Sequence, residues 1–526
     1  ASCLVGSEMC IRDRLKTIPI IDLFAGPGGL GEGFSSIIDG AGKRRFDVRV
    51  SIEKDPIAHQ TLLLRAVYRY FPKSAVPKCY YDYVRGEISR TEFFEHPRIV
   101  DAYEHAKSEA RQAELGLTPS SVTDGWIEEA LKGVKDWALI GGPPCQAYSL
   151  AGRARMRGNE GFEDDKRHFL YKEYLRIIKK FRPSVFVMEN VKGMLTSQHG
   201  GSPIFDRIIA DLRQPDNGLS YRIQSLVVEG EDLDPHDFII KSEDYGIPQR
   251  RHRVILFGIR SDVAADAPAL KNVTGRFKLK PTEKKVGVLT AITGLPRIRS
   301  RVSKQKDSLE TWLGIIQKAP QKLKLWKDER RADFEAAMTA AAKKASRLKD
   351  HGSAFIRMDV DYGQHMPATL KNWYEDSKLG GVLQHESRSH MESDLYRYMF
   401  ASCYAVAEKI SPKIFDFPNT LLPEHANVTS DDVPFQDRFR VQLGTEPATT
   451  VVSHISKDGH YYIHPDPSQC RSLTVREAAR LQTFPDNYFF EGGRTAQFHQ
   501  IGNAVPPLLA RQIAEIVSDF LSAAKR

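Results

Sequence analysis

Short apolar runs alternate with amphipathic stretches over the first 260 residues of the chain. The apolar runs predict buried strands at 18–24, 48–52, 137–140, 185–188, 226–228 and 254–259. Stretches with apolar residues at helical spacing predict helices from about 30 and at 56–70, 170–181 and 204–212. Alternation of this kind favours an α/β fold with a doubly wound, mostly parallel, Rossmann-like sheet.

The alternation stops after Arg260. Residues 261–470 carry basic stretches and scattered prolines, with one predicted helix at 329–349. We interpret its apolar stripe as core packing; the stripe consists of Phe334, Met338, Ala341, Ala345 and Leu348. A helix predicted at 508–521 follows two prolines and is expected to return to the first domain. We therefore predict a second domain inserted into the first.

The predicted boundaries follow from these changes of pattern. The first domain spans 15–262 and is completed by 491–526, and the inserted domain spans 263–490. The charged segment 71–118 is predicted to be a mostly helical insertion on the first domain. Residues 1–14 resemble translated sequencing adaptor and lack the apolar core of a secretion signal. We expect that segment to be non-native or disordered.

Composition narrows the class of protein. The 526 residues are 41% hydrophobic and 27% charged, and no run of 18 apolar residues occurs, so we expect a cytoplasmic protein without a membrane span. The six cysteines have neither CxxC nor Cys/His spacing, which argues against structural zinc and against a disulfide framework. The net charge is +9, and segment 297–357 has 16 Lys+Arg against 7 Asp+Glu, a surplus of 9. This surplus favours a polyanionic partner, with a solvated helix face as the alternative.

Three separated motifs carry candidate chemistry. Cys145 follows Gly141-Gly142-Pro143-Pro144 at the end of a predicted strand, where α/β sheets bind ligands. Glu189 ends another apolar run, and a carboxyl there can donate a proton or a hydrogen bond. Gln249, Arg251 and Arg253 alternate, so they share one face of an extended chain. Arginines can lower the pKa of a thiol or bind phosphate. An inert thiol, a capping acid and a strand edge are the alternatives, but together the motifs predict a catalytic site.

A glycine-rich turn follows the first predicted strand. It reads Phe24-x-Gly26-x-Gly28-Gly29, and Glu53 ends the second strand. Glycines let the backbone approach a ligand, and an acid at this place can bind ribose hydroxyls. The turn therefore suggests a nucleoside-containing cofactor, with a plain tight turn as the alternative. Because GxGxxG spacing is missing, a dinucleotide is disfavoured.

Taken together, these motifs are similar to those of the cytosine-5 DNA methyltransferases of bacterial and phage type. The resemblance covers nearly all of residues 18–260 and 470–516. The similar blocks stand in the family's order: Asp22-Leu23-Phe24-Ala25-Gly26-Pro27-Gly28-Gly29, Gly142-Pro143-Pro144-Cys145-Gln146, Glu189-Asn190-Val191, Gln249-Arg250-Arg251-His252-Arg253, Arg471-Ser472-Leu473-Thr474-Val475-Arg476-Glu477 and Gly502-Asn503-Ala504-Val505.

The resemblance implies a class I methyltransferase fold that uses S-adenosylmethionine. Phe24 would pack on the adenine and Glu53 would bind the ribose hydroxyls. The other implied cofactor contacts are Gly26, Gly28, Gly29, Pro144, Leu170, Asn503 and Ala504. Asp124 stands at the family's spacing for an adenine contact, although Thr123-Asp124-Gly125-Trp126 is a loose match, and Lys54 replaces an aromatic residue.

The family mechanism implied by the resemblance gives each motif a role. Cys145 would add to carbon 6 of a cytosine flipped out of duplex DNA, so that carbon 5 can take the methyl group. Glu189 and Arg253 would hold the base, and Arg251 would position the loop or the cysteine. Segment 149–167, which carries five arginine or lysine residues, would close over the DNA.

The inserted domain would be the target-recognition domain. Segment 453–459, with His460 and His464, is expected near the DNA, and no metal is expected. We expect a monomer on double-stranded DNA, acting beside a cognate restriction endonuclease in a restriction–modification system.

Three rival functions remain open. An RNA cytosine methyltransferase of the same fold is disfavoured by the roughly 210-residue variable segment 261–470, since the tRNA-acting relatives are shorter. A DNA-binding regulator without catalysis is disfavoured because Cys145, Glu189, Arg251 and Arg253 are all present. A nicotinamide oxidoreductase is disfavoured by the missing GxGxxG.

Overall fold

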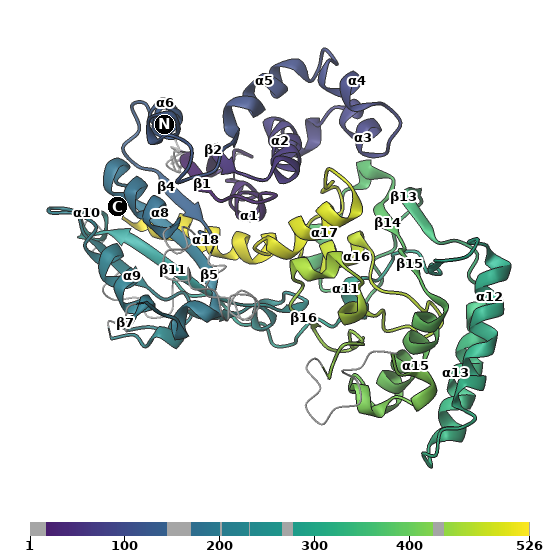
Figure 1. The fold of residues 1–526 in the computed structure, drawn as a ribbon. Helices are drawn as coiled ribbons and strands as arrows, with labels where there is room; N and C mark the ends of the chain where they lie inside the picture. The colour runs from purple at the N-terminus through teal and green to yellow at the C-terminus, as the bar shows by residue number, and fades with distance from the viewer. Residues whose placement is uncertain are drawn as a thin grey trace, which may run out of the picture.

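The structure is a computed structural model that describes residues 17–40, 42–144, 170–199, 202–230, 232–265, 277–423 and 436–524. Cys145 and the segment 149–167 lie outside the described residues. We call residues 277–470 the second lobe and the rest of the described chain the first lobe. In Figure 1 the central sheet lies in the first lobe, and the long helices α12 and α13 form the far edge of the second.

A mixed sheet forms the centre of the first lobe. Its order is β3-β2-β1-β4-β5-β11-β8, and β9 also pairs with β11. The strands are β1 (Ile18–Leu23), β2 (Phe46–Glu53), β3 (Ala110–Gln112), β4 (Ala138–Gly141), β5 (Val185–Val191), β8 (Tyr221–Gln224), β9 (Ile239–Lys241) and β11 (His252–Arg260). From β3 to β5 all neighbours are parallel, whereas β11 runs antiparallel to β5, β8 and β9. The predicted mostly parallel α/β sheet is confirmed.

Both faces of the sheet are covered by helices. Ile18 and Ile20 of β1 pack in one apolar cluster with α1 (Gly29–Ser35) and α18 (Pro507–Ala523). Ile21 and Leu23 belong to a second cluster on the other face. The helices on that face are α6 (Ser120–Ala130), α8 (Leu170–Phe181) and α9 (Ile204–Arg213). Strands buried on both faces read as continuous apolar runs, and for this reason the sequence pattern identified most of them.

Two strands depart from the sequence prediction. The strand predicted at 226–228 is wrong: the nearby strand is β8, and Leu226 instead accepts a hydrogen bond from the Leu279 N–H at 2.8 Å. Strand β3 was not predicted, because its three residues form no apolar run. It pairs with β2 so that Gln112 lies opposite Glu53. Strand β3 therefore extends the sheet at its edge beside β2.

The insertion between the second and third predicted strands is mainly helical, as predicted. Helix α2 (Pro56–Tyr70) begins at Asp55, whose side chain caps the N–H groups of Ile57 and Ala58. The next helices are α3 (Lys78–Val84), α4 (Arg90–Phe94) and α5 (Val100–Glu109). Their buried aromatic and aliphatic side chains form an apolar cluster that also includes Leu379 and Leu383 of the second lobe. Figure 1 shows α3 beside the antiparallel pair of β13 (Gly352–Arg357) and β14 (Gly381–Glu386).

The second lobe has its own apolar core, which contains Trp312, Met338 and Phe400. Its helices are α11 (Val288–Ala291), α12 (Leu309–Lys318), α13 (Arg331–Ala345), α14 (Ala368–Tyr374) and α15 (Glu392–Glu408). Its strands are β12 (Arg301–Val302), β13 (Gly352–Arg357), β14 (Gly381–Glu386), β15 (Ser389–His390) and β16 (Ala448–Thr449). The stripe predicted on α13 is buried, which confirms its interpretation as core packing, although the helix itself is shorter than predicted.

The chain returns to the first lobe through three helices. These are α16 (Val475–Leu481), α17 (Arg494–Asn503) and α18, and Figure 1 shows this yellow segment running back to the sheet. Helix α18 packs so closely on α1 that a Cβ on Gly33 would lie 2.4 Å from the Ala510 Cβ. No helix in the described part of the chain is long and apolar enough to cross a membrane.

Candidate active site

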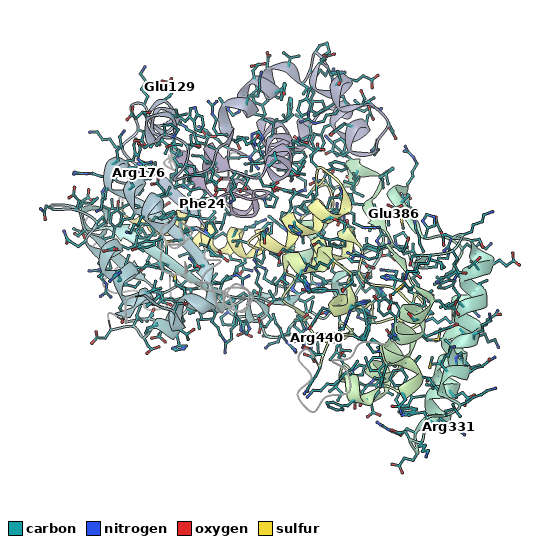
Figure 2. All side chains as sticks on the ribbon, in the orientation of Figure 1. Phe24, Glu129, Arg176, Arg331, Glu386 and Arg440 are labelled. Carbon is teal, nitrogen blue, oxygen red and sulfur yellow. The ribbon has the colours of Figure 1, made fainter. Side chains whose placement is uncertain are left out.

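The glycine-rich turn between β1 and α1 has an unusual backbone. Phe24, Gly26 and Gly28 have φ values of 57°, 58° and 95°, in the left-handed region that glycine adopts readily. Phe24 is the strained member because it carries a Cβ, and its half-buried ring is labelled in Figure 2. A Cβ built on Gly26 would meet no atom within 4 Å, so open space adjoins the turn.

Glu53 joins this turn to the start of α2. One carboxylate oxygen accepts the Gly26 N–H at 2.8 Å, and the other accepts the Asp55 N–H at 2.8 Å. Burial raises the pKa of Glu53, and these backbone N–H groups oppose the rise. The carboxylate is therefore held at the end of β2, and each oxygen has a further lone pair for a ligand hydroxyl.

The third side of the turn is formed by the chain after α17. A Cβ on Gly29 would lie 2.3 Å from the Val505 carbonyl oxygen, and Gln482 donates to the Ala504 carbonyl at 2.7 Å. Asn503 is exposed beside them. The structure thus brings the segment of Asn503 and Ala504 to the glycine-rich turn, as the resemblance implied.

We predict that Gly29→Ala destabilises the protein. The new Cβ cannot stay 2.3 Å from a backbone oxygen, so α1 or the Val505 segment must shift. The expected loss is about 1–3 kcal/mol of unfolding free energy, measured by chemical denaturation. Gly125→Ala on α6 is the control. Its Cβ meets nothing within 4 Å, so it should stabilise by about 0.5–1 kcal/mol. Equal stability of the two variants would contradict the packing argument.

Glu189 and Arg253 form a buried ion pair at the end of β5. The Arg253 Nε lies 2.9 Å from a Glu189 carboxylate oxygen, and the side chains are 14% and 13% exposed. The antiparallel pairing of β5 and β11 sets this distance, because Ile255 lies opposite Glu189. Burial lowers the pKa of Arg253, and the nearby Glu189 carboxylate counteracts it.

The loop that leads to Cys145 lies against the same pair. A Cβ on Gly142 would lie 3.0 Å from the second Glu189 oxygen. Asn190 donates to the Pro143 carbonyl at 3.3 Å, while its own amide oxygen accepts the Val191 N–H. The end of β5 therefore anchors the loop after β4 up to Pro144. Cys145 follows Pro144 in the sequence and lies outside the described residues.

Arg251 makes different contacts from Arg253. Its guanidinium donates to the carbonyls of Val451 at 3.1 Å and Gly502 at 3.2 Å, and the residue is 3% exposed. Burial, together with the neighbouring Arg253, lowers its pKa to about 9. Arg251 thus connects the strand of Arg253 to the second lobe and to the end of α17. This is the geometry of a positioning residue.

Asp124 lies on α6, with both carboxylate oxygens in ion pairs with α8. Arg176 is 2.8 Å away and Lys180 is 2.9 Å away, and hydrogen bonds from these two side chains hold the Asp124 pKa down against burial. The chain beside Glu53 is instead the loop after β3, because the Ala113 N–H donates to the Glu53 carbonyl at 3.0 Å. In that loop a Cβ on Gly116 would lie 3.6 Å from Leu170. No periodic pattern marks this loop, so the sequence analysis assigned it to the insertion.

Comparison with known families identifies the family of this protein. A model of the C-5 cytosine-specific DNA methylase family matches residues 120–519, which is most of the chain. The chain belongs to the C-5 cytosine-specific DNA methylases. The methylase is therefore a DNA (cytosine-5-)-methyltransferase, as the sequence blocks indicated.

Similar proteins span nearly the whole methylase. The type II methyltransferase M.Bpa9945I of Bacillus paralicheniformis is 31% identical over 96% of this chain and 99% of its own length. M.AgeI of Thalassovita gelatinovora is 26% identical over 95% of this chain and 99% of its own. The crystal structure of a prophage-encoded E. coli protein, assigned as a DNA modification methyltransferase, covers 96% of this chain with a TM-score of 0.50 and 21% identity. That structure supports the fold alone.

The block from Arg471 to Glu477 forms a buried network in the methylase. Arg471 pairs with both Glu477 oxygens at 2.7 and 2.6 Å, and Thr474 forms a capping box with Glu477 at the start of α16. His464 lies 3.5 Å from Glu477 and is 3% exposed, and His460 is 7% exposed. Both histidines are core residues, and the expectation that they lie near the DNA stays a prediction. No group of three or more potential metal ligands is found among the described residues.

Acid should destabilise the methylase through its buried histidines. Burial lowers the pKa of His464 to about 3 and that of His385 to about 4, from 6.5. Below pH 6.5 the unfolded chain takes up protons that the folded chain cannot, so stability falls as the pH falls towards 4. Between pH 6.5 and 5 each histidine should cost about 2 kcal/mol of unfolding free energy.

Denaturant titrations at pH 7 and pH 5 measure this loss. His464→Gln should reduce the pH dependence, whereas His236→Gln, at a side chain 72% exposed, should leave it as in the wild type. An equal slope in His464→Gln and the wild type would rule out the contribution of His464.

Proposed function

We propose that the methylase transfers a methyl group from S-adenosylmethionine to carbon 5 of a cytosine flipped out of duplex DNA, through a covalent adduct with Cys145. The observation that carries the proposal is the buried Glu189–Arg253 pair against the Gly142–Pro144 loop. This places an acid and a guanidinium beside the chain that leads directly to the only nucleophile in the motif.

The turn after β1 fits the nucleoside part of the methyl donor. The open space beside Gly26, the ring of Phe24 and the fixed Glu53 carboxylate match a base and a ribose with two hydroxyls. The remaining proposed contacts are Gly28, Gly29, Asp124, Pro144, Leu170, Asn503 and Ala504. For Asp124 this requires a rearrangement of its pairs with α8. When bound, the donor supplies an activated methyl group on a sulfonium sulfur.

The residues of this chain then have distinct tasks. The Cys145 thiolate forms a bond to carbon 6 of the cytosine, and the displaced electron pair makes carbon 5 nucleophilic. Glu189 donates a hydrogen bond or proton to the ring nitrogen as negative charge builds there, and Arg253 holds the ring carbonyl. Carbon 5 forms its bond to the methyl group, whose bond to the sulfonium sulfur would break with its electron pair left on that sulfur. Water takes the proton from carbon 5, the electrons of that bond return to the ring, and the bond between carbon 6 and the Cys145 sulfur breaks.

The second lobe is proposed to read the DNA sequence. The surplus lysine and arginine residues of segment 297–357 would contact phosphates, while other side chains contact the edges of the DNA bases. M.Bpa9945I and M.AgeI are both named type II methyltransferases. We therefore propose that this methylase is the cytoplasmic modification enzyme of a type II restriction–modification system, acting as a monomer on DNA beside a cognate endonuclease.

Methyl transfer from labelled S-adenosylmethionine tests this proposal. The purified full chain should label duplex DNA and not tRNA, and bisulfite sequencing of DNA from expressing cells should reveal 5-methylcytosine at one sequence. Transfer to tRNA alone would favour an RNA methyltransferase. A duplex that is bound but not methylated would favour a regulator without catalysis.

A further inference from the structure

The helical insertion of the first lobe lies against the second lobe, and its contacts there are extensive. Tyr81 of α3 donates a hydrogen bond to an Asp376 carboxylate oxygen at 2.9 Å. Arg85, just after α3, donates to the carbonyls of Leu379 at 2.9 Å and Lys378 at 2.5 Å. These polar contacts lie just before β14, which pairs antiparallel with β13, and Figure 1 shows this strand pair beside α3.

Apolar side chains are also buried in this contact between the insertion and the second lobe, which we call the junction. Leu379 and Leu383 of the second lobe are 1% and 0% exposed, and both belong to the apolar cluster of the insertion with Tyr80 and Phe93. Phe355 of β13 packs against the same cluster. Burying two leucines in this way stabilises the junction by a few kcal/mol in total, so the contact is not a loose surface encounter.

Asp376 links this junction to the methyl-donor side of the protein. The Asp376 oxygen that accepts from Tyr81 also accepts from the Asn487 amide at 2.6 Å. Asn487 in turn accepts from Arg65 at 3.0 Å, and Arg65 pairs with Glu32 of α1 at 2.6 Å. A buried chain of hydrogen bonds therefore connects the second lobe to the helix that begins at the glycine-rich turn.

The second lobe is also attached at the catalytic strand. Strands β10 (Gln249–Arg250) and β16 pair there, and Arg251 donates to the Val451 carbonyl at 3.1 Å. The second lobe is held at other places too: Trp373 donates to the Thr483 carbonyl at 2.7 Å, and the Leu383 carbonyl accepts from Arg476 at 3.0 Å. Residues of both lobes also share one apolar cluster. The attachment at Asp376 adds the insertion to the segments of the first lobe that hold the second. From Asp376 the chain continues through β14 and β15 into α15, the central helix of the second-lobe core.

We propose that residues 71–109 form a clasp that holds the second lobe at a fixed angle to the catalytic sheet, with Asp376 as its positioning residue. A preset angle means that DNA binds without the cost of ordering two mobile lobes. It also keeps β11, the strand of Arg253, at a fixed position relative to the second lobe, which is proposed to contact the target DNA. The inference goes beyond the proposed function, since it concerns how the two lobes are held and not the reaction.

The test removes three polar contacts of the clasp and keeps its shape, while the contacts of Lys73 with Glu375, of Lys378 with Ser74 and of Arg357 with Glu87 remain. Tyr81→Phe with Arg85→Met deletes the three hydrogen bonds to Asp376, Leu379 and Lys378. The matched control is Tyr103→Phe with Arg90→Met, at two insertion side chains that have no hydrogen bond or ion pair to the second lobe among the described residues. Asp376→Asn serves as a milder third variant in case the double variant fails to fold.

The clasp variant is expected to lose affinity for DNA but not for the methyl donor. The clasp variant should bind a cognate duplex about tenfold more weakly and turn over about tenfold more slowly, while its Kd for S-adenosylmethionine stays within about twofold. Small-angle scattering of the DNA-free protein should show a broader distance distribution than the control. An unchanged scattering profile with unchanged duplex affinity would overturn the proposal, as would an equal loss of donor binding. Absence of methylation by the wild type would refute the proposed function alone, because the scattering comparison needs no activity.

Discussion

Cys145→Ser should abolish methyl transfer to duplex DNA. The variant keeps a small polar side chain after Pro144, but a serine hydroxyl is not ionised near neutral pH and cannot add to carbon 6 as a thiolate does. We expect turnover to fall by on the order of 10⁴-fold or more, as removal of an attacking nucleophile does in other enzymes. Labelled methyl transfer measures the loss, and binding of S-adenosylmethionine should persist because the glycine-rich turn is untouched.

A covalent trap sharpens this test. A duplex with 5-fluorocytosine at the target should form a stable adduct with the wild type in the presence of donor, because fluorine at carbon 5 cannot leave as a proton does. Cys145→Ser should form none. Cys79→Ala, at a buried thiol on α3, should still form the adduct and remain active. Turnover by Cys145→Ser at the wild-type rate would exclude the covalent mechanism.

Glu189→Gln should lower kcat by about 10²–10⁴-fold. The amide keeps the shape of the side chain but can neither carry the charge that pairs with Arg253 nor supply a proton to the base. Since the Arg253 guanidinium is only 14% exposed, it loses its partner in a poorly hydrated place, and folding stability should also drop by about 1–3 kcal/mol.

Glu243→Gln is the matched control for this prediction. Glu243 is equally a buried acid paired with a residue of the same strand, since its carboxylate lies 2.9 Å from the His252 ring. That pair involves His252, which lies between Arg251 and Arg253, and within the described chain the Glu243 carboxylate has no hydrogen bond or ion pair with the Gly142–Pro144 loop. Its loss should change kcat by less than about tenfold. Similar kinetics for the two variants would mean that Glu189 acts only through folding.

The local sequence pattern predicted the bounds of an element well where the element is buried on both faces or where residues that end a strand or helix follow it. The strand that ends before Phe24 and the amphipathic helix at 170–181 were both predicted close to their observed bounds. Predictions failed where pairing partners decide the structure. Strand β3 exists because β2 offers a free edge. Of the apolar residues at 226–228, Leu226 is buried without joining a ladder, whereas Val228 is exposed.

The histidines show the same limit in the second lobe. His460 and His464 stand in a polar segment, which favours an exposed position. In the structure they accept hydrogen bonds inside a core that also holds the Arg471–Glu477 pair. Their burial depends on side chains contributed by distant segments, and no window of local sequence records such contacts.

The amino-acid sequence by itself determined the order of strands and helices in the first lobe, the glycine-rich turn and the identity of the candidate catalytic side chains. These follow from hydrophobic period, turn chemistry and functional groups, all of which act over a few neighbouring residues. Only the tertiary structure decided that Glu189 pairs with Arg253, that Arg251 holds Val451 and Gly502, and that residues 71–109 grip the second lobe. Those contacts join residues tens to hundreds of positions apart, and their geometry exists only once the sheet and both cores have packed.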